Sequence, residues 1–429
     1  MLLEIVQFAG CLPSLVQNET GPMLSTAHKT PAWLTIIADA TVGLISAPAL
    51  IQSHRAQEKG QGMTPVNRNK RVVAYSVNPQ APCHEVETNR ALAQWLAQIL
   101  GWEYGDSHDP QAGHDLYLLP TQTLIGTETL MRLGVKGPED VWGGYVEHDF
   151  ICTKAITHGL LNKDAVAPKG WSPLFAKLTR GAVLDGVTVF SLKDARPAAE
   201  HLLYTGPIRL KPIHACAGRG QRLIKSLAQF DEIAAGPDAQ ALFRDGVVLE
   251  QHLNEVKTQS VGQSFINGKV LSYCGVQHLT HDSEGLEVYG GSDLLVVQGG
   301  YIELLRLELP DDVREAVRLA QVFDEAANQA YPSFFASRRN YDIAQGLDAA
   351  GQPRGGVLEQ SWRMGGASSA ELAALQVFVE APQTSAVRVS SVETYTEQPL
   401  PPGAREVYRG AAHNGDFLLK YVTVQSYDG

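Results

Sequence analysis

The sequence predicts an α/β plus α+β architecture: a small unit with a parallel sheet, followed by units in which antiparallel strands dominate. Between residues 72 and 119, a strand-like run, a helix-like run and a second strand-like run follow one another, which is typical of a parallel sheet covered by helices. Farther along, Asn267-Gly268 separates two apolar runs and is a strong signal for a two-residue hairpin turn. Two strand candidates with polar residues at alternate positions come in the last third of the chain.

The composition is that of a folded, acidic protein. Of 429 residues, 44% are hydrophobic and 19% are charged, which suffices for cores in about three domains. The 35 lysines and arginines face 46 acidic residues, a balance that argues against nucleic acid as a partner. No apolar run is long enough to cross a membrane, so we expect no membrane association. The five cysteines are far apart and form no C-x-x-C pair, which favours a cytoplasmic protein without a zinc ribbon.

Residues 1–62 differ from the rest. They lack a sustained helical or alternating period, contain four prolines and end in a polar stretch of linker composition. We therefore expect an N-terminal appendage or linker at 1–62 and an α/β domain at 63–150. In that domain we expect a strand at Val72–Val77 and a helix at Glu85–Leu100, whose apolar residues recur at helical spacing. Asp115–Leu119 is the next strand candidate, and a short helix follows around residues 128–133.

Two lysines are candidates for binding phosphate. Lys154 is expected in the first turn of a helix, where a lysine taken alone is usually a solvated charge. Lys211 is expected on a strand that runs into a loop containing Gly218 and Gly220. Glycines allow a backbone to approach a phosphate closely and to present N–H groups to it, and Lys211 would add a positive charge. His214 in the same loop is a further phosphate-binding candidate.

An apolar strand, GVVLEQHL, follows and suits an adenine and ribose site. The backbone up to Leu253 can hydrogen-bond the base edge, while the Glu250 carboxylate accepts ribose hydroxyls.

The last candidates form an acidic pair with an arginine. Glu359, Ser361 and Arg363 occupy alternate positions, so in a strand they project from one face, and Asp342 could lie on the neighbouring strand. Carboxylate oxygens on adjacent strands suit Mg²⁺, which prefers a few carboxylates together with substrate phosphates. Arg363 would oppose a phosphate or an acyl-phosphate oxyanion. The alternative is that these polar residues simply face solvent on a half-exposed sheet.

The order of these features resembles the ATP-grasp superfamily, whose enzymes use ATP to join a carboxylate to an amine, a thiol or a carbon nucleophile. The resemblance extends from about residue 71 to residue 379. It implies an ATP-grasp architecture with a small parallel-sheet N-terminal domain, a lid subdomain at 151–253 and a metal-binding subdomain with an antiparallel sheet at 254–385. Residues 386–429 are left as a C-terminal tail.

The resemblance also implies a role for seven side chains. In chain order these are the first nucleotide-contacting lysine (Lys154), a second lysine on the lid (Lys211), the hinge acid beside adenine (Glu250), a further polar position (Glu255), two metal-binding acids (Asp342 and Glu359) and the arginine that follows (Arg363). Lys211 and Arg363 are the expected catalytic residues.

One position departs from the family pattern. The usual Glu-x-Asn is Glu359-Gln360-Ser361 here, and a serine hydroxyl is a shorter and weaker metal ligand than an amide oxygen. The surrounding LEQSWRMGGASSAEL resembles a bacterial ATP-grasp-like group rather than a ligase branch with a named substrate.

The resemblance implies an enzyme that uses ATP and Mg²⁺. A small-molecule carboxylate would be activated as an acyl phosphate and attacked by an amine or a similar nucleophile. Two alternatives stay open at this point: a catalytically weakened module that binds nucleotide as a sensor, and a phosphotransferase on the same scaffold.

Overall fold

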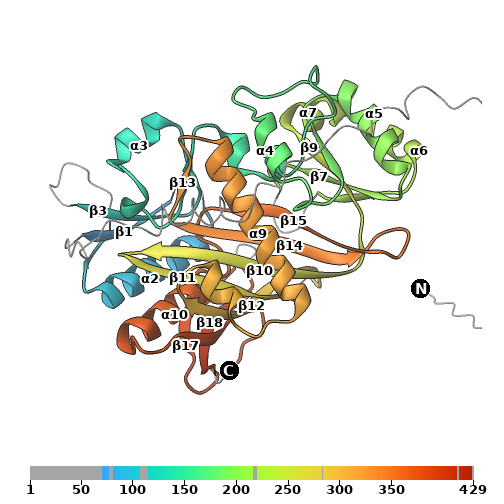
Figure 1. Ribbon diagram of the computed structural model, residues 1–429. Helices are drawn as coiled ribbons and strands as arrows, with labels where there is room; N and C mark the ends of the chain where they lie inside the picture. Colours follow the sequence, from blue (N-terminus) through green and yellow to red (C-terminus); the bar gives the residue numbers. More distant parts are fainter. Residues whose placement is uncertain are drawn as a thin grey trace, which may run out of the picture. The chain divides into compact units, whose positions relative to one another are not determined.

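A parallel sheet of three strands opens the described part of the chain in the computed structural model (Figure 1). The structure describes residues 70–76, 81–106, 115–215, 220–282, 284–412 and 415–427, so the expected appendage at 1–62 lies outside the described residues. The sheet has the order β2-β1-β3, with β1 at Arg71–Tyr75, β2 at Glu103–Gly105 and β3 at Leu116–Pro120. Helix α2 (Cys83–Leu100) joins β1 to β2 and ends at Gly101, whose φ of 65° is the left-handed cap typical of glycine. The predicted parallel α/β unit is thus confirmed.

A short sheet and several tight turns lead from this unit to the next. The sheet has the order β13-β5-β4, with β4 at Leu124–Ile125, β5 at Gly144–Val146 and β13 at Phe335–Ala336. Helix α3 spans Thr127–Leu133, close to the predicted helix, and 3-10 turns occupy Pro138–Asp140, Asp149–Cys152 and Lys154–Thr157.

The prediction of a helix beginning at Lys154 is wrong, because residues Lys154–Thr157 form a single 3-10 turn. The Thr153 hydroxyl caps this turn by accepting from the Ala155 N–H, and His158 after it is already extended. The Gly159 carbonyl accepts a hydrogen bond from Thr188 N at 2.9 Å, which draws the chain onto the next sheet. Long-range pairing therefore overrides the helical spacing of the apolar residues.

A four-stranded antiparallel sheet carries Lys211 and Glu250, and it is called the lid sheet below after the lid subdomain that the resemblance implies. Its order is β6-β9-β7-β8, with β6 at Gly186–Val189, β7 at Ile208–Pro212, β8 at Arg222–Ile224 and β9 at Val247–Gln251. Helices α5 (Leu192–Leu203), α6 (Leu227–Ala234) and α7 (Ala239–Asp245) share one apolar cluster with these strands. Helix α4 (Pro173–Leu178) precedes them and packs against α9 instead.

The second antiparallel sheet, called the large sheet below, has eight strands in the order β15-β14-β10-β11-β12-β16-β18-β17. Asn267 and Gly268, with φ of 47° and 78°, form the hairpin turn between β10 and β11, as predicted. The segments expected in a C-terminal tail supply three strands of this same sheet. The bounds are β10 Asn254–Ile266, β11 Lys269–His281, β12 Glu287–Gln298, β14 Arg338–Leu347, β15 Pro353–Ser361, β16 Ala386–Thr394, β17 Arg405–Ala411 and β18 Phe417–Ser426.

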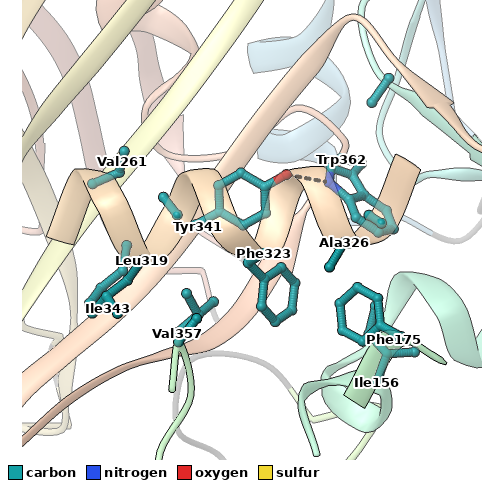
Figure 2. Packing of buried hydrophobic residues seen from close by; sticks show 14 of the residues in the cluster. Ile156, Phe175, Val261, Leu319, Phe323, Ala326, Tyr341, Ile343, Val357 and Trp362 are labelled. Carbon is teal, nitrogen blue, oxygen red and sulfur yellow. Dashed lines mark hydrogen bonds between the residues drawn. The ribbon is translucent and has the colours of Figure 1, made fainter. Parts of the chain in front are cut away.

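Helices cover both faces of the large sheet. Helices α8 (Tyr301–Leu305) and α9 (Asp311–Ala330) share an apolar cluster with one face, in which Phe323 packs against Tyr341 with ring centroids 5.6 Å apart (Figure 2). Helices α10 (Ser368–Glu380) and α2 share a second cluster with the other face. The second face keeps a strip of polar side chains beside α10. None of the helices in the described ranges is both long enough and apolar enough to cross a membrane.

Candidate functional site

The acidic pair lies where two strands of the large sheet meet. Strands β14 and β15 are antiparallel, and their register places Asp342 directly opposite Glu359. Leu358 is the extra residue of a β-bulge, because the next pair is Ile343 with Val357. Ser361 lies opposite Asn340 and is the last residue of β15. Side chains directly opposite one another project from the same face, so both carboxylates and the serine share that face.

Two amides hold the Asp342 carboxylate. Gln277 Nε2 on β11 donates to Asp342 Oδ1 at 2.7 Å, and Asn340 Nδ2 donates to the same oxygen at 3.1 Å. Burial and then the negative charge of Glu359 raise the pKa of Asp342 to about 7, against the opposing effects of these hydrogen bonds and of Arg363. The acidic pair is therefore electrostatically strained, and a cation between the carboxylates would relieve the strain.

Replacing Asp342 by asparagine is expected to stabilise the protein without ligand at alkaline pH. The raised pKa means that the folded state of the unchanged protein loses stability as pH rises from the ordinary value of 3.8 through about 7, because the buried group must then ionise. Asparagine cannot ionise, so the variant should gain on the order of 1–3 kcal/mol at pH 8. Urea unfolding at pH 5 and pH 8 measures this difference. Asp245→Asn, at an exposed position, is the control and should show no such gain. If the unchanged protein and the Asp342→Asn variant lost the same stability between pH 5 and pH 8, Asp342 would not be the group with the raised pKa.

Lys154 connects the acidic pair to the loop between β7 and β8 of the lid sheet. Its side chain is only 7% exposed, and its Nζ lies 2.8 Å from Glu359 Oε2 and 2.5 Å from the carbonyl oxygen of Ala215. The ammonium group thus lies between a carboxylate on the large sheet and the loop that follows Lys211.

Neighbouring residues explain why Lys154 reaches Glu359. Gln360 Nε2 donates to the carbonyl oxygens of Ile151 and Thr153 at 2.8 and 2.7 Å. The Thr157 hydroxyl donates to the Leu358 carbonyl at 3.1 Å. These hydrogen bonds from side chains to backbone carbonyls attach the segment before the lid sheet to β15, and so hold Lys154 close to Glu359.

Lys211 and Glu250 form a second pair on the lid sheet. The two residues lie on paired strands, and Lys211 Nζ donates to Glu250 Oε1. The other oxygen, Oε2, lies 2.9 Å from His158 Nε2, and all three side chains are buried. Burial alone would raise the pKa of Glu250, but the charge of Lys211 and the hydrogen bonds from His158 and Lys211 hold it below its usual range. Both oxygens expected to meet a ribose are therefore engaged with these partners in this structure.

The remaining predicted residues lie around these pairs. His214 is exposed in the loop after β7, Gly220 stands just before β8 with φ of 68°, and Gly218 lies outside the described residues. Leu253 is buried in a small apolar cluster with Leu184, Ala344 and Leu358.

Glu255 and Arg363 complete the predicted set. Glu255 is exposed at a bulge of β10, with φ of 50°. Arg363 follows β15 instead of lying on it, and its Nη1 donates to the carbonyl oxygen of Met364 at 2.6 Å. Its charge nevertheless reaches the acidic pair, since it acts to lower the pKa of Asp342.

Sequence reasoning missed four residues around the two pairs: His158, Gln277, Asn340 and Glu371. The alternation Arg338-x-Asn340-x-Asp342 was a signal for Asn340, since it places three polar side chains on one face of a strand. His158, Gln277 and Glu371 gave no such signal, because their partners are distant in sequence.

The acidic pair suits Mg²⁺ that shares its ligands with phosphates. Within the part of the chain that the structure describes, no group of three or more His, Cys, Asp or Glu residues could hold a metal ion by itself. Asp342 and Glu359 could offer two hard oxygen donors and Ser361 a third, a small set of the kind that Mg²⁺ takes when substrate phosphates complete its shell. The observation behind this fit is that the two carboxylates lie directly opposite each other on paired strands, where their like charges repel.

The architecture implied by the sequence resemblance is present. A small parallel sheet, a four-stranded lid sheet and a large antiparallel sheet follow one another, and a lysine from the segment before the lid sheet meets an acid of the large sheet. The mixed α/β fold, with a small parallel sheet and a larger antiparallel sheet, is as predicted.

Solved structures of ligases align with the chain at low identity. A phosphoribosylamine–glycine ligase from Thermotoga maritima is 12% identical with a TM-score of 0.44, over 83% of this chain and 93% of the other. The D-cycloserine synthetase DcsG is 11% identical with a TM-score of 0.41, over 72% and 98%. A RiPP-associated ATP-grasp ligase from Chryseobacterium gregarium, solved with ADP and with leader and core peptides, is 8% identical with a TM-score of 0.35, over 73% and 96%. These values are low, so the function proposed below rests on this chain's own residues.

The search of curated proteins found no match. A family model described as "Protein of unknown function (DUF3182)" matches residues 72–422, which span nearly all of the folded elements described above. The chain belongs to the DUF3182 family.

Proposed function

We propose that the protein is an ATP- and Mg²⁺-dependent ligase that activates a small-molecule carboxylate as an acyl phosphate for attack by an amine or a similar nucleophile. The observation that carries this proposal is the contact of Lys154 with Glu359 at 2.8 Å, at the point where Glu359 lies opposite Asp342. This contact supports the proposal because it would bring a cation-binding acidic pair and a phosphate-binding lysine together at one place.

Exchange of partners explains how the nucleotide is received. In this structure Lys154 is paired with Glu359, and Lys211 is paired with Glu250. We expect phosphate oxygens to replace the carboxylates as partners of both lysines, while Glu359 turns to the cation. Lys154, Lys211 and Glu359 each gain a partner of opposite charge in this exchange, while Glu250 keeps its hydrogen bond with His158 and turns to the ribose hydroxyls.

Asp342 and Glu359, with Ser361 beside them, would hold Mg²⁺. When bound, the cation would neutralise charge on the phosphates during transfer. The amides of Gln277 and Asn340 keep the Asp342 carboxylate oriented, because both donate to its Oδ1. The serine hydroxyl replaces an amide at the third position, so we expect weaker cation binding than a Glu-x-Asn pair gives.

The chemistry needs positioning and charge neutralisation more than a protein nucleophile. An oxygen of the substrate carboxylate attacks the γ-phosphorus, the bond to the β,γ-bridging oxygen breaks, and ADP leaves. The second nucleophile then attacks the acyl carbon, and the C–O bond to phosphate breaks. Arg363 opposes the oxyanion that develops at this stage, and closure of the lid sheet protects the acyl phosphate from water.

Oxygen-isotope transfer tests this proposal. Candidate carboxylates labelled with ¹⁸O are incubated with ATP, Mg²⁺ and a panel of amines, and the released phosphate is analysed by mass spectrometry. The proposal predicts ADP and phosphate carrying one ¹⁸O from the carboxylate. Phosphate without label, formed together with product, would contradict an acyl-phosphate intermediate.

Ser361, which stands where the family pattern has asparagine, favours one other function, a nucleotide-binding sensor with weakened catalysis. A sensor should bind nucleotide tightly and form no ADP with any compound of the same panel. A stable phosphorylated product would instead indicate a phosphotransferase.

A further inference from the structure

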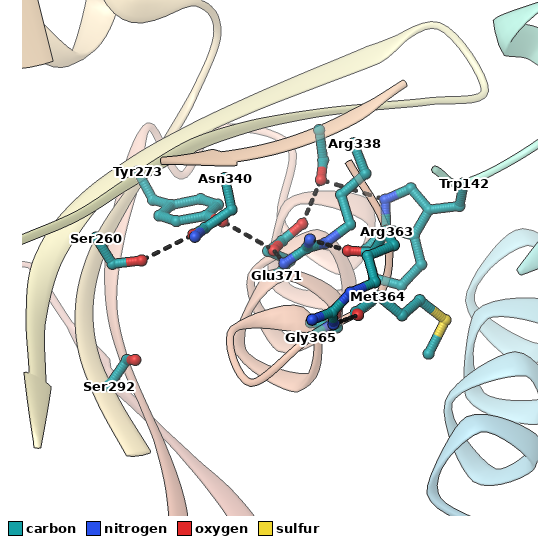
Figure 3. A network of polar contacts seen from close by, with 12 residues as sticks. Trp142, Ser260, Tyr273, Ser292, Arg338, Asn340, Arg363, Met364, Gly365 and Glu371 are labelled. Carbon is teal, nitrogen blue, oxygen red and sulfur yellow. Dashed lines mark hydrogen bonds and ion pairs between the residues drawn. The ribbon is translucent and has the colours of Figure 1, made fainter. Parts of the chain in front are cut away.

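A network of polar side chains lies beside the acidic pair, and its central member is not among the residues discussed for the proposed reaction. Glu371, on the first turns of α10, is 0% exposed. Its Oε1 accepts from Arg338 Nη2 at 2.7 Å, and the Ser264 hydroxyl donates to its Oε2. Figure 3 shows Arg338, from β14, reaching this carboxylate on α10.

One branch of this network leads to the acidic pair. The Tyr273 hydroxyl lies 3.0 Å from Glu371 Oε1 and 2.9 Å from Asn340 Oδ1, so it contacts both groups and can donate its one proton to either oxygen. The Ser260 hydroxyl donates to the same Asn340 oxygen at 2.7 Å. With its oxygen occupied in this way, Asn340 presents its Nδ2 to Asp342 Oδ1, at 3.1 Å.

The other branch leads to the predicted catalytic arginine. Arg338 is 1% exposed, and its two terminal nitrogens bind different elements. Nη2 binds Glu371, while Nη1 donates to the backbone carbonyl of Arg363. The segment between β15 and α10, which carries Arg363, is thus anchored through Arg338 to the Glu371 carboxylate. The same carboxylate is linked to Asp342 through Tyr273 and Asn340.

We propose that Glu371 is a positioning residue of this site, acting on Asp342 in one direction and on Arg363 in the other. The inference rests on the proposed function, since it assigns to Asp342 the cation and to Arg363 the developing oxyanion. A buried ion pair is weak evidence for stability alone, because well-packed apolar residues of similar volume often replace such a pair without loss. The branches to two predicted site residues give this pair a second role.

Tyr273→Phe is the sharpest test, because it removes one hydroxyl and leaves the pair of Arg338 with Glu371 in place. Binding of the non-hydrolysable analogue AMPPNP to the full-length protein is measured by calorimetry as Mg²⁺ is increased. Loosening a residue that orients a metal ligand typically weakens metal affinity by 10-fold or more, so the variant should need about tenfold more Mg²⁺ for half-saturation. Its affinity for AMPPNP without Mg²⁺ should stay unchanged.

Tyr301→Phe is the matched control. Among the described residues, Tyr301 is a buried tyrosine whose hydroxyl has no hydrogen-bond partner, and it packs in the cluster beneath α9. This variant should require the same Mg²⁺ concentration as the unchanged protein. Thermal unfolding of both variants shows whether any difference comes from loss of the fold.

The double variant Arg338→Met/Glu371→Leu separates positioning from stability. Removing both charges together leaves no unpaired buried ion, so we expect it to fold with a melting temperature near that of the unchanged protein. It should nevertheless show the same rise in the Mg²⁺ requirement. An unchanged requirement in both the Tyr273 variant and the double variant would overturn the inference and leave the proposed function standing. Absence of Mg²⁺-dependent AMPPNP binding in the unchanged protein would overturn both.

Discussion

Replacing Glu359 by glutamine is expected to lower ATP turnover by about 100-fold or more, because the proposed metal-binding pair loses one of its two charges. Glutamine has nearly the same shape and still offers an oxygen to Lys154, which lies 2.8 Å from the carboxylate in the unchanged protein. The fold should therefore persist, and the loss should appear in kcat. Steady-state release of phosphate, with unfolding followed in parallel, measures both quantities.

The control for this variant is Glu315→Gln on α9. Glu315 is about half exposed and is paired with Arg318 at 3.7 Å on the surface, where such pairs contribute about 0–1 kcal/mol. Turnover by the control should equal that of the unchanged protein. Undiminished ATP consumption by the Glu359 variant would remove Glu359 from the proposed site.

Replacing Lys211 by methionine is expected to have the largest effect on stability. The Glu250 carboxylate is 1% exposed and contacts both Lys211 and His158. The variant would leave it with His158 alone of these two partners. Breaking a buried ion pair from one side typically costs about 3–5 kcal/mol. Nucleotide binding should be lost as well, since Lys211 is the lysine proposed to meet the phosphates from the lid sheet. Urea unfolding and calorimetry with AMPPNP measure the two effects.

The double variant Lys211→Met/Glu250→Leu distinguishes the two effects. It removes the orphaned charge, so most of the lost stability should return while nucleotide binding stays absent. A surface control, Lys257→Met, removes an exposed pair with Asp312 and should change stability by about 1 kcal/mol or less. Nucleotide binding by the double variant at the unchanged affinity would contradict the role of Lys211.

Lowering the pH should remove the stability that the pair of Lys211 and Glu250 contributes. Because the pKa of Glu250 is held below its ordinary value of 4.5, its ionisation contributes stability above that pH, and this contribution is lost as pH falls through the lower, folded-state value. The variant that lacks Lys211 should show less of this acid dependence. Unfolding curves between pH 3 and pH 6 follow it directly.

The strands and the acidic pair were predictable because their signals are local. Asp342 and Glu359 each lie in a β-rich run with alternating polar residues, and a strand pair brings such residues to one face. The bulge at Leu358 was not predictable, since it depends on how β15 docks onto Lys154 and its neighbours. The pairing of Asp342 with Glu359 therefore follows from the sequence in outline, whereas its register follows from tertiary contacts.

The helix expected at Lys154 shows where local spacing is overruled. Ile156, Leu160 and Leu161 recur at helical intervals, yet the chain leaves the helical conformation at His158, whose ring contacts Glu250 from a strand 92 residues away. Glu371 is a comparable case. It resembles an ordinary acidic residue in the first turns of a helix, and only the fold brings it to Arg338.

A crystal structure with AMPPNP and Mn²⁺ in place of Mg²⁺ is the most direct test of the central claim that one metal–nucleotide complex joins the two lysines and the two acids. We expect an anomalous Mn²⁺ peak between Asp342 and Glu359, and phosphate oxygens in contact with Lys154 and Lys211. A nucleotide bound elsewhere, or Lys211 still paired with Glu250 beside an ordered triphosphate, would contradict it.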